Sequence, residues 1–224
     1  MSEYINISGI KKRYKKKEVL KGIDLKAGKG EIIGIIGNNG SGKSTLLSIL
    51  AGALAADSGV FECGGSNLLT DPKTRRKTVG YVPQGNALME ELSAMDNLLL
   101  WAEKKDIERE LENGVLAMLG IDSFIKTTVS KMSGGMKKRL SIGCTVVGHP
   151  DVLLLDEPCA ALDIVCKDSI YDYFRQYVGD GGTILMATHE LYEIGLCNRC
   201  VLLKDGVFTD YVYDGDAHRL AALM

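Results

Sequence analysis

The sequence predicts an α/β fold, and three observations support this prediction. A β-branched run at residues 32–36 leads into a glycine-rich turn and then into a run that suits a helix. A continuous apolar run at 152–155 ends in two acids, as expected for a strand buried on both faces of a parallel sheet. Between these two regions apolar residues recur every four positions, which indicates helices. We therefore expect an α/β core with an antiparallel β subdomain and an inserted helical subdomain.

The glycine-rich turn has the pattern Gly-x-x-x-x-Gly-Lys-Ser at residues 37–44. Its glycines let the backbone curl so that N–H groups point inward at the positive end of the next helix, which suits phosphate. Lys43 would reach the β- and γ-phosphates, and the Ser44 hydroxyl would ligate Mg²⁺. An ordinary glycine-rich turn is the alternative. The pattern predicts a P-loop NTPase core that binds nucleotide through Gly37, Asn38, Asn39, Gly40, Ser41, Gly42, Lys43, Ser44 and Thr45.

Short strands are predicted around this loop. Residues 4–7, 19–25 and 31–36 are joined so closely that we expect them to pair antiparallel, because a parallel crossover needs about a dozen residues. Further strands are predicted at residues 59–65, 78–82 and 183–187, and a hairpin around Asp205-Gly206 at residues 199–213.

The inserted helical subdomain is expected at residues 86–148, within one domain that spans residues 1–224. Ser93 is expected to cap a helix. The run Leu98–Trp101 is expected to be core, and an exposed edge that docks a partner is the alternative. One amphipathic helix that ends at Gly120 is predicted from the four-residue spacing of Ile107, Leu111, Val115 and Leu119.

Composition narrows the functional classes. The net charge is −2, so no global basic field favours nucleic acid or an anionic membrane surface, and no nucleic-acid partner is expected. The basic cluster at residues 11–17 is either a solvated loop or a feature of a nucleotide site. No apolar run is long enough for a membrane span or a signal peptide, so we expect a cytoplasmic protein. The lone Cys197-x-x-Cys200 is expected to be packing rather than a zinc or redox site.

Polar residues at the ends of predicted strands complete the pattern. Asp156 lies at the tip of a buried strand, where it can hold the Mg²⁺ shell, and Glu157 can polarise an attacking water. His189 ends the next strand and could bond a γ-phosphate. Alone, two acids after an apolar run are as often a strand meeting solvent, and a lone histidine is usually structural. Beside a phosphate loop they predict phosphoryl transfer.

The chain resembles the nucleotide-binding subunits of ATP-binding cassette (ABC) transporters from about Tyr4 to Gly206. The motifs that carry the resemblance are the phosphate loop, the signature Met132-Ser133-Gly134-Gly135-Met136, and the run 152–158 that follows it by about twenty residues. The resemblance implies that Tyr14 stacks on adenine and that Gln84 contacts Mg²⁺ and the attacking water. It also implies that His189 is a switch histidine and that residues 160–163 couple two active sites.

The resemblance also implies partners. Ser133, Gly134 and Gly135 would bind the γ-phosphate held by a second cassette, of the same or a homologous chain, in a head-to-tail ATP sandwich dimer. An integral-membrane transporter subunit would dock around residues 85–97, on the inner face of the cell membrane. The expected catalytic residues are then Glu157, His189, Gln84 and Lys43, the metal ligands are Ser44, Gln84 and Asp156, and the cofactors are ATP and Mg²⁺.

Three positions depart from the usual pattern: Met136 replaces a frequent Gln, Cys159 a frequent Thr, and Ala160 a frequent Ser. None removes a predicted catalytic group, although the Ala160 change could loosen coupling between sites. The leading hypothesis is an ATPase subunit that energises a separate membrane-spanning subunit, with export favoured. A soluble ABC ATPase acting on ribosomes or DNA is the alternative. A non-catalytic cassette is a third hypothesis, which Glu157 argues against.

Overall fold

The computed structural model describes residues 3–85, 87–160, 162, 164–216, 218, 220 and 222. Two sheets form its centre. A four-stranded antiparallel sheet has the order β2 (Lys17–Gly28), β1 (Glu3–Tyr14), β4 (Ser58–Cys63), β5 (Ser66–Asn67). A six-stranded sheet has the order β10 (Val207–Tyr211), β9 (Arg199–Lys204), β3 (Ile32–Ile36), β8 (Thr183–Ala187), β7 (Val152–Asp156), β6 (Val79–Val82). Its strands are parallel except β10, which pairs antiparallel with β9. The predicted α/β class with antiparallel and parallel sheets is confirmed.

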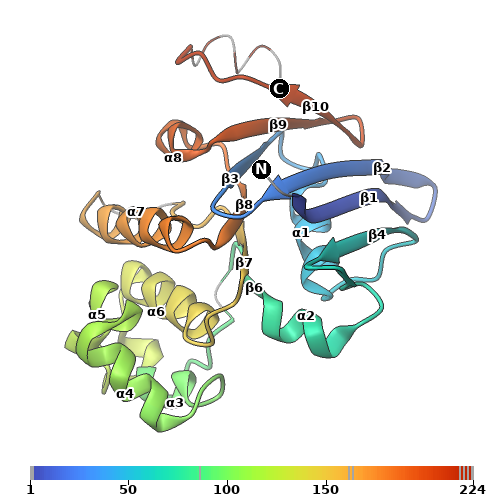
Figure 1. Cartoon of the computed structure of the whole chain (residues 1–224). Helices are drawn as coiled ribbons and strands as arrows, with labels where there is room; N and C mark the ends of the chain where they lie inside the picture. The colour runs from blue at the N-terminus through green and yellow to red at the C-terminus, as the bar shows by residue number, and fades with distance from the viewer. Residues whose placement is uncertain are drawn as a thin grey trace.

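Helices surround these sheets (Figure 1). Two belong to the part that precedes β6, namely α1 (Lys43–Ala51) and α2 (Pro72–Thr78). Between β6 and β7 lie α3 (Ala94–Leu98), α4 (Lys104–Asn113), α5 (Val115–Met118) and α6 (Gly134–Val146), with short 3₁₀ turns at Asp122–Phe124 and Val129–Lys131. In the described part of the chain, α7 (Ile164–Gly179) follows β7 and α8 (Leu191–Leu196) follows β8.

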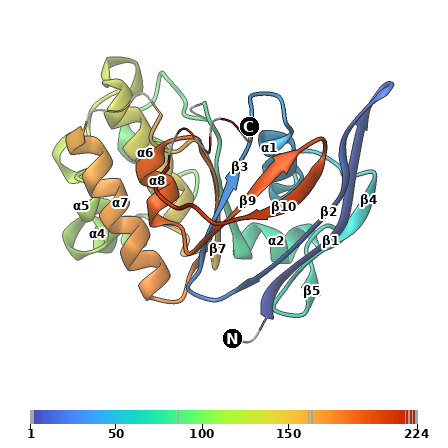
Figure 2. The ribbon, with the colours of Figure 1, turned by 90° about the horizontal axis from the view of Figure 1, so that it is seen from above.

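Alternation of side chains along the parallel strands builds a layered molecule. Ile33 and Ile35 of β3 pack with α1 and with the antiparallel sheet, whereas Ile32 packs on the opposite side. The side chains of β7 and β8 also alternate between these two sides, because successive side chains in a strand point to opposite faces. Figure 2 shows the result from above: the antiparallel strands on one side, the parallel strands between, and α4–α7 on the other side.

The parallel strands place their carboxyl ends at one edge of the sheet. Strands β3, β6, β7 and β8 run in the same direction, so the segments that follow them emerge together. These segments begin at Gly37, Pro83, Glu157 and Thr188. In open α/β sheets this edge is where ligands bind. The predicted phosphate loop, Gln84, the pair Asp156 and Glu157, and His189 therefore lie together at this edge of the sheet.

One predicted strand pairing is wrong. Strands β1 and β2 pair antiparallel as expected, but residues 32–36 join the other sheet, between β8 and β9, and both pairings are parallel. A tight connection requires its two strands to be neighbours in space, and a turn between two packed sheets satisfies that as well as a hairpin does. The turn after Gly28 is held by Glu31, whose carboxylate accepts the Gly28 N–H at 2.9 Å.

The predicted continuous helix up to Gly120 is also wrong. Helix α4 ends at Asn113, and α5 starts again at Val115. The Glu110 side chain turns back and accepts the Val115 N–H at 3.0 Å, which replaces a helical hydrogen bond at the break. A Cβ on Gly114 would lie 2.0 Å from that carboxylate oxygen, so the glycine makes room for it. The predicted Ser93 cap is confirmed, in a capping box with Asp96.

The run Leu98–Trp101 is not core throughout. Leu98 is fully buried, but Leu99, Leu100 and Trp101 are 43%, 56% and 62% exposed. Helix α3 ends at Leu98, so the residues after it leave the helical face that points inward. The alternative, an exposed apolar edge, matches the structure.

Cys197 and Cys200 pack against the middle of β3, the strand that precedes the phosphate loop. A Cβ on Gly34 would stand 2.9 Å from each of the two sulfur atoms, so the glycine makes room for both thiols between α8 and β9. Among the described residues no group of three or more His, Cys, Asp and Glu side chains is placed to hold a metal ion. The described helices include none that is both long and apolar enough to span a bilayer.

Candidate active site

The loop between β3 and α1 has the geometry that an anion requires. Gly40 and Gly42 have φ of +79° and +113°, in the left-handed region that favours glycine. A Cβ on Gly37 would lie 2.6 Å from the Leu203 carbonyl oxygen, so only glycine fits there. Among the described residues no side-chain cap hydrogen bond is found at Gly42, the N-cap of α1, which leaves the first N–H groups of the helix available to another acceptor. Backbone donors and the positive end of the helix therefore converge on this loop.

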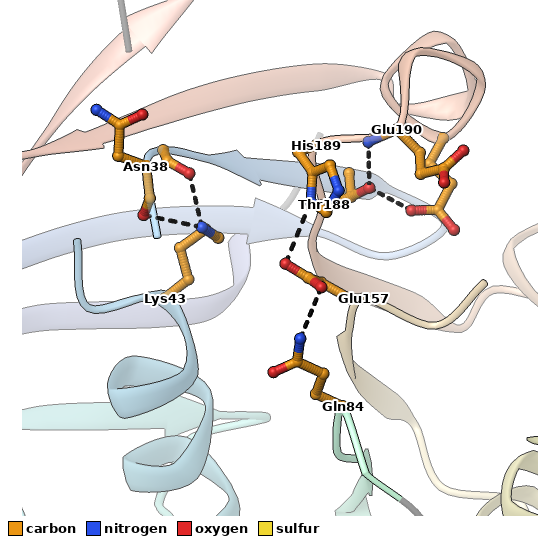
Figure 3. Close-up of polar contacts among 9 residues, drawn as sticks. Asn38, Lys43, Gln84, Glu157, Thr188, His189 and Glu190 are labelled. Atoms are coloured by element: carbon orange, nitrogen blue, oxygen red, sulfur yellow. Dashed lines mark hydrogen bonds and ion pairs between the residues drawn. The ribbon is translucent and has the colours of Figure 1, made fainter. Parts of the chain in front are cut away.

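Lys43, the first residue of α1, is held inside the loop. Its Nζ donates to the carbonyl oxygens of Gly37 at 2.6 Å and Asn38 at 3.2 Å, and the residue is only 6% exposed (Figure 3). Burial lowers the pKa of Lys43, and the nearby carboxylates of Glu157 and Asp156 act in the opposite direction. The ammonium thus spans the loop that a phosphate would enter, and an incoming phosphate oxygen could replace the two carbonyls.

Asp156 is the last residue of β7 and is 3% exposed. Burial raises the pKa of Asp156, while a hydrogen bond from Ser44 and the charge of Lys43 act to lower it. A hydroxyl and a carboxylate in contact are the oxygen ligands that Mg²⁺ accepts, since this ion takes one or two protein oxygens together with substrate phosphates. The Ser44–Asp156 pair therefore fits Mg²⁺.

Glu157 lies between two polar side chains from neighbouring strand ends. Its Oε2 accepts from Gln84 Nε2 at 2.8 Å, and its Oε1 lies 3.2 Å from His189 Nδ1. Figure 3 shows the carboxylate between these two partners, across from Lys43. The side chain is 11% exposed, whereas that of His189 is 51% exposed. The structure therefore brings together the predicted water-polarising acid, glutamine and histidine.

The other predicted residues stand apart from this group. Tyr14 ends β1 and is 46% exposed, with the Lys12 ammonium 5.7 Å from its ring centroid. The basic cluster around it is strand and tight turn rather than an open loop. Ser133 caps α6 by accepting the Met136 N–H at 3.2 Å. Ser133 and Gly134 are exposed. Of the expected coupling segment 160–163, Ala161 and Asp163 lie outside the described residues, as does Asn86 at the start of the expected helical subdomain.

Sequence reasoning missed two buried polar residues near this group. Lys138 is 5% exposed, although it stands in a Lys-Lys-Arg run that reads as a solvated helix face. Glu193 is fully buried, and it accepts the hydroxyl of Thr188, the residue before His189. The only sequence signal for Glu193 is its place four residues after His189, which does not distinguish a buried acid from an exposed one.

A strand, a glycine-rich phosphate loop and a helix, with acids at the neighbouring strand end, define the nucleotide-binding P-loop class of α/β proteins. A protein-family model described as "ABC transporter" matches residues 20–160. The chain belongs to the ABC transporter ATP-binding family, whose members are nucleotide-binding ATPase cassettes.

Similar proteins of known family support this assignment. The chain is 32% identical to the probable multidrug ABC transporter ATP-binding protein YbhF of Escherichia coli (strain K12), over 98% of this chain and 39% of YbhF. It is 32% identical to the linearmycin resistance ATP-binding protein LnrL of Bacillus subtilis (strain 168), over 90% of this chain and 67% of LnrL. The chain thus spans well under half of YbhF.

Solved structures share the whole fold. The ATP-binding subunit of an ABC transporter superposes with a TM-score of 0.85 at 25% identity, over 97% of this chain and 93% of its own. A dimeric ATP-binding cassette in a post-hydrolysis state, bound to ADP and Pi, superposes with a TM-score of 0.83 at 26% identity, over 95% of this chain and 100% of its own.

Proposed function

We propose that this chain hydrolyses ATP as one of two cassettes that energise a separate membrane-spanning subunit, and that the transport is export. The observation that carries the ATPase part is the position of Glu157, bonded to Gln84 and His189 beside the Lys43 loop. A carboxylate held by two partners next to a phosphate loop is placed to act on a water that attacks the γ-phosphate.

Each group has a step in this reaction. Tyr14 stacks on the adenine, the glycine-rich loop binds the phosphates through its N–H groups, and Lys43 exchanges the Gly37 and Asn38 carbonyls for phosphate oxygens. Ser44, Asp156 and Gln84 would hold Mg²⁺, which supplies positive charge against the charge that develops on the phosphates. Glu157 accepts a proton from the attacking water. The oxygen of that water bonds to the γ-phosphorus, and the bond between the γ-phosphorus and the oxygen that leaves with ADP breaks. His189 orients Glu157 and can bond the γ-phosphate.

A second cassette completes the site in this proposal. Gly134 and Gly135 begin the 13-residue helix α6 and Ser133 is its N-cap, and Ser133 and Gly134 are exposed to solvent. An exposed N-terminus with a serine hydroxyl suits an anion, and the anion here is the γ-phosphate held by the Lys43 loop of another cassette. A dimeric cassette among the solved relatives supports this arrangement.

A groove supports docking of a membrane-spanning subunit near residues 85–97. It has a volume of about 860 Å³ and lies between the end of α1, α2 and β6 on one side and α6 on the other. Trp101 and Leu88 line it beside Arg75 and Arg76. A groove lined by both apolar and cationic side chains suits a short amphipathic segment of the partner. This would hold the chain at the cytoplasmic face of the membrane.

The names of the relatives favour transport over the alternative, a soluble ATPase acting on ribosomes or DNA, because a probable multidrug ABC transporter ATP-binding protein and a linearmycin resistance ATP-binding protein are among them. The same names favour export. A pull-down from detergent-solubilised membranes separates the two hypotheses: an integral-membrane partner supports the proposal, and ribosomal or DNA-bound partners contradict it.

The ATPase itself is tested with Glu157→Gln. The amide keeps the shape of the side chain but cannot accept the proton, so hydrolysis should fall about 10²–10⁴-fold while ATP binding persists. Phosphate release by the wild type and the variant measures the first effect, and isothermal titration with Mg-ATP the second. A variant that hydrolyses ATP at the wild-type rate would remove Glu157 from the mechanism.

A further inference from the structure

Helix α6 carries a buried lysine that the reaction described above does not use. Lys138 is 5% exposed, and its Nζ donates to the Pro83 carbonyl oxygen at 3.0 Å. An ammonium taken out of water is costly unless partners compensate, so a buried lysine is held by the groups around it. The bonded carbonyl belongs to the segment that leaves β6, whereas the lysine belongs to α6. This bond therefore joins two elements far apart in the sequence.

The bonded carbonyl lies directly before a residue of the active site. Pro83 precedes Gln84, whose amide donates to Glu157 Oε2 at 2.8 Å. Anchoring the Pro83 carbonyl therefore fixes where the Gln84 side chain starts. Since the Gln84 amide is one of two partners of the Glu157 carboxylate, the position of Lys138 reaches Glu157 through two hydrogen bonds and one peptide unit.

The same lysine is fixed relative to the start of its helix. Lys138 lies five residues after Ser133, and both belong to one helix, with Ser133 as its N-cap. About one and a half turns of a hydrogen-bonded helix move as a rigid unit. Any shift of the Ser133 end therefore carries the Lys138 ammonium with it.

Acidic groups on other elements act on the charge of Lys138. Burial lowers the pKa of Lys138, and Cys159, Asp156, Glu193 and Glu157 act in the opposite direction. Lys43 and Lys138 are the two lysines that are buried among the described residues, and Asp156 and Glu157 influence both. One cation comes from the phosphate loop and the other from α6, so Asp156 and Glu157 have a cation on each of these two elements.

We propose that Lys138 is a positioning residue that couples the Ser133 end of α6 to the Gln84–Glu157 pair. When a γ-phosphate engages Ser133, α6 settles in one position, Lys138 holds the Pro83 carbonyl there, and Gln84 keeps Glu157 aimed at the attacking water. When Ser133 is not engaged, the same bond lets Gln84 follow the helix. This inference rests on the proposed ATPase function.

The test compares Lys138→Met with Lys138→Arg in the full chain. Methionine keeps most of the length and packing but has neither donor nor charge, whereas arginine keeps both. Residues that orient a metal-ligating side chain, as Lys138 would orient Gln84, typically contribute about 10–100-fold to activity. Lys138→Met should therefore lower kcat by about that factor. KM for ATP and the Mg-ATP dissociation constant should stay within about twofold, because the hydrogen bond found for the Lys138 side chain in the described part of the chain goes to Pro83 and not to the phosphate loop or Tyr14. Lys138→Arg should restore most of kcat.

Lys137, next to Lys138 on α6, provides a matched control. The Lys137 ammonium pairs with Glu90 at 2.8 Å on the surface, an arrangement that contributes little, so Lys137→Met should keep wild-type kcat and KM. Melting temperatures are measured for all variants.

The outcomes are separable. Wild-type kcat in Lys138→Met would overturn the positioning role while the ATPase, measured on the wild type and on Glu157→Gln, still stands. Loss of Mg-ATP affinity together with a lowered melting temperature would make Lys138 a structural residue and also overturn the proposal. Absence of hydrolysis by the wild type would defeat the proposed function and this inference with it.

Discussion

Glu157 adopts a backbone conformation that is unusual for its residue type. Its φ is +49°, in the left-handed region, which costs a residue with a Cβ about 1–2 kcal/mol. Its N–H still donates to the Ala187 carbonyl at 2.9 Å, so the turn comes directly after the last ladder bond between β7 and β8. Pro158 follows and is buried. The local cost is offset by the fold around it, and strain of this kind gathers at functional sites.

Tyr14 gives a prediction at the same scale. Its ring is half-exposed at the end of β1, so removing it should cost little core packing. Tyr14→Ala should weaken Mg-ATP binding by about 1–3 kcal/mol, on the scale of base–aromatic stacking, and Tyr14→Trp should be tolerated. Isothermal titration measures the affinities. A lowered melting temperature with unchanged affinity would make Tyr14 structural and remove it from the nucleotide site.

The elements that a few adjacent residues determine could be predicted from the sequence. Strand β7 is a continuous apolar run, the β9–β10 hairpin turns at Asp205-Gly206 with φ of +52° and +83°, and Ser93 caps α3. These signals act over four to six residues and need no knowledge of the rest of the chain. The Glu157 neighbourhood was predictable for a different reason: the carboxyl ends of strands in a parallel sheet meet at one edge.

Elements whose character depends on distant partners were not predictable. The sheet that β3 joins is decided by β8 and β9, which follow more than 140 residues later in the chain. The break at Gly114 depends on the Glu110 side chain folding back, and a helical period cannot reveal it. The burial of Lys138 depends on the segment after β6, whose Pro83 carbonyl accepts its ammonium, and on groups from other elements. Periodicity records which side of an element is apolar but not what covers it.

Helix α8 yields a prediction on pH. Burial raises the pKa of Glu193 above that of an unfolded glutamate, so the folded state binds its proton more tightly. Stability from this group is therefore present below the ordinary pKa of about 4.3 and is lost as pH rises through the raised value. Glu193→Gln can still accept the Thr188 hydroxyl but cannot ionise, so the variant should lack this loss.

The measurement is the melting temperature of the wild type and Glu193→Gln across the pH range. The difference, variant minus wild type, should grow more positive as pH rises. Glu112→Gln, at an exposed position of α4, is the matched control and should show no such trend. A constant difference between Glu193→Gln and the wild type would contradict the buried, proton-retaining carboxyl.

At the scale of the whole molecule, the two halves of the proposed site belong to different parts of one chain. The phosphate loop and α1 pack with the antiparallel sheet, whereas α6 packs with α3, α5 and α7 on the other face of the parallel sheet. None of the hydrogen bonds found for Ser133 and Gly134 within the described part of the chain reaches the phosphate loop. In the proposed head-to-tail dimer, each α6 start would lie on the other copy's loop, and ATP would be the ligand shared between subunits.

The measurement that tests this account most directly is the mass of Glu157→Gln in solution with ATP and Mg²⁺, by size-exclusion chromatography with light scattering. Unhydrolysed ATP should convert the 24.3 kDa monomer into a dimer, while ADP should leave it monomeric. The control is the double variant Glu157→Gln, Gly134→Asp. A Cβ on Gly134 meets nothing within 4 Å, so the aspartate should fit the fold, yet its charge should repel the γ-phosphate and keep the protein monomeric. A Glu157→Gln variant that binds ATP, does not hydrolyse it and stays monomeric would contradict the ATP sandwich.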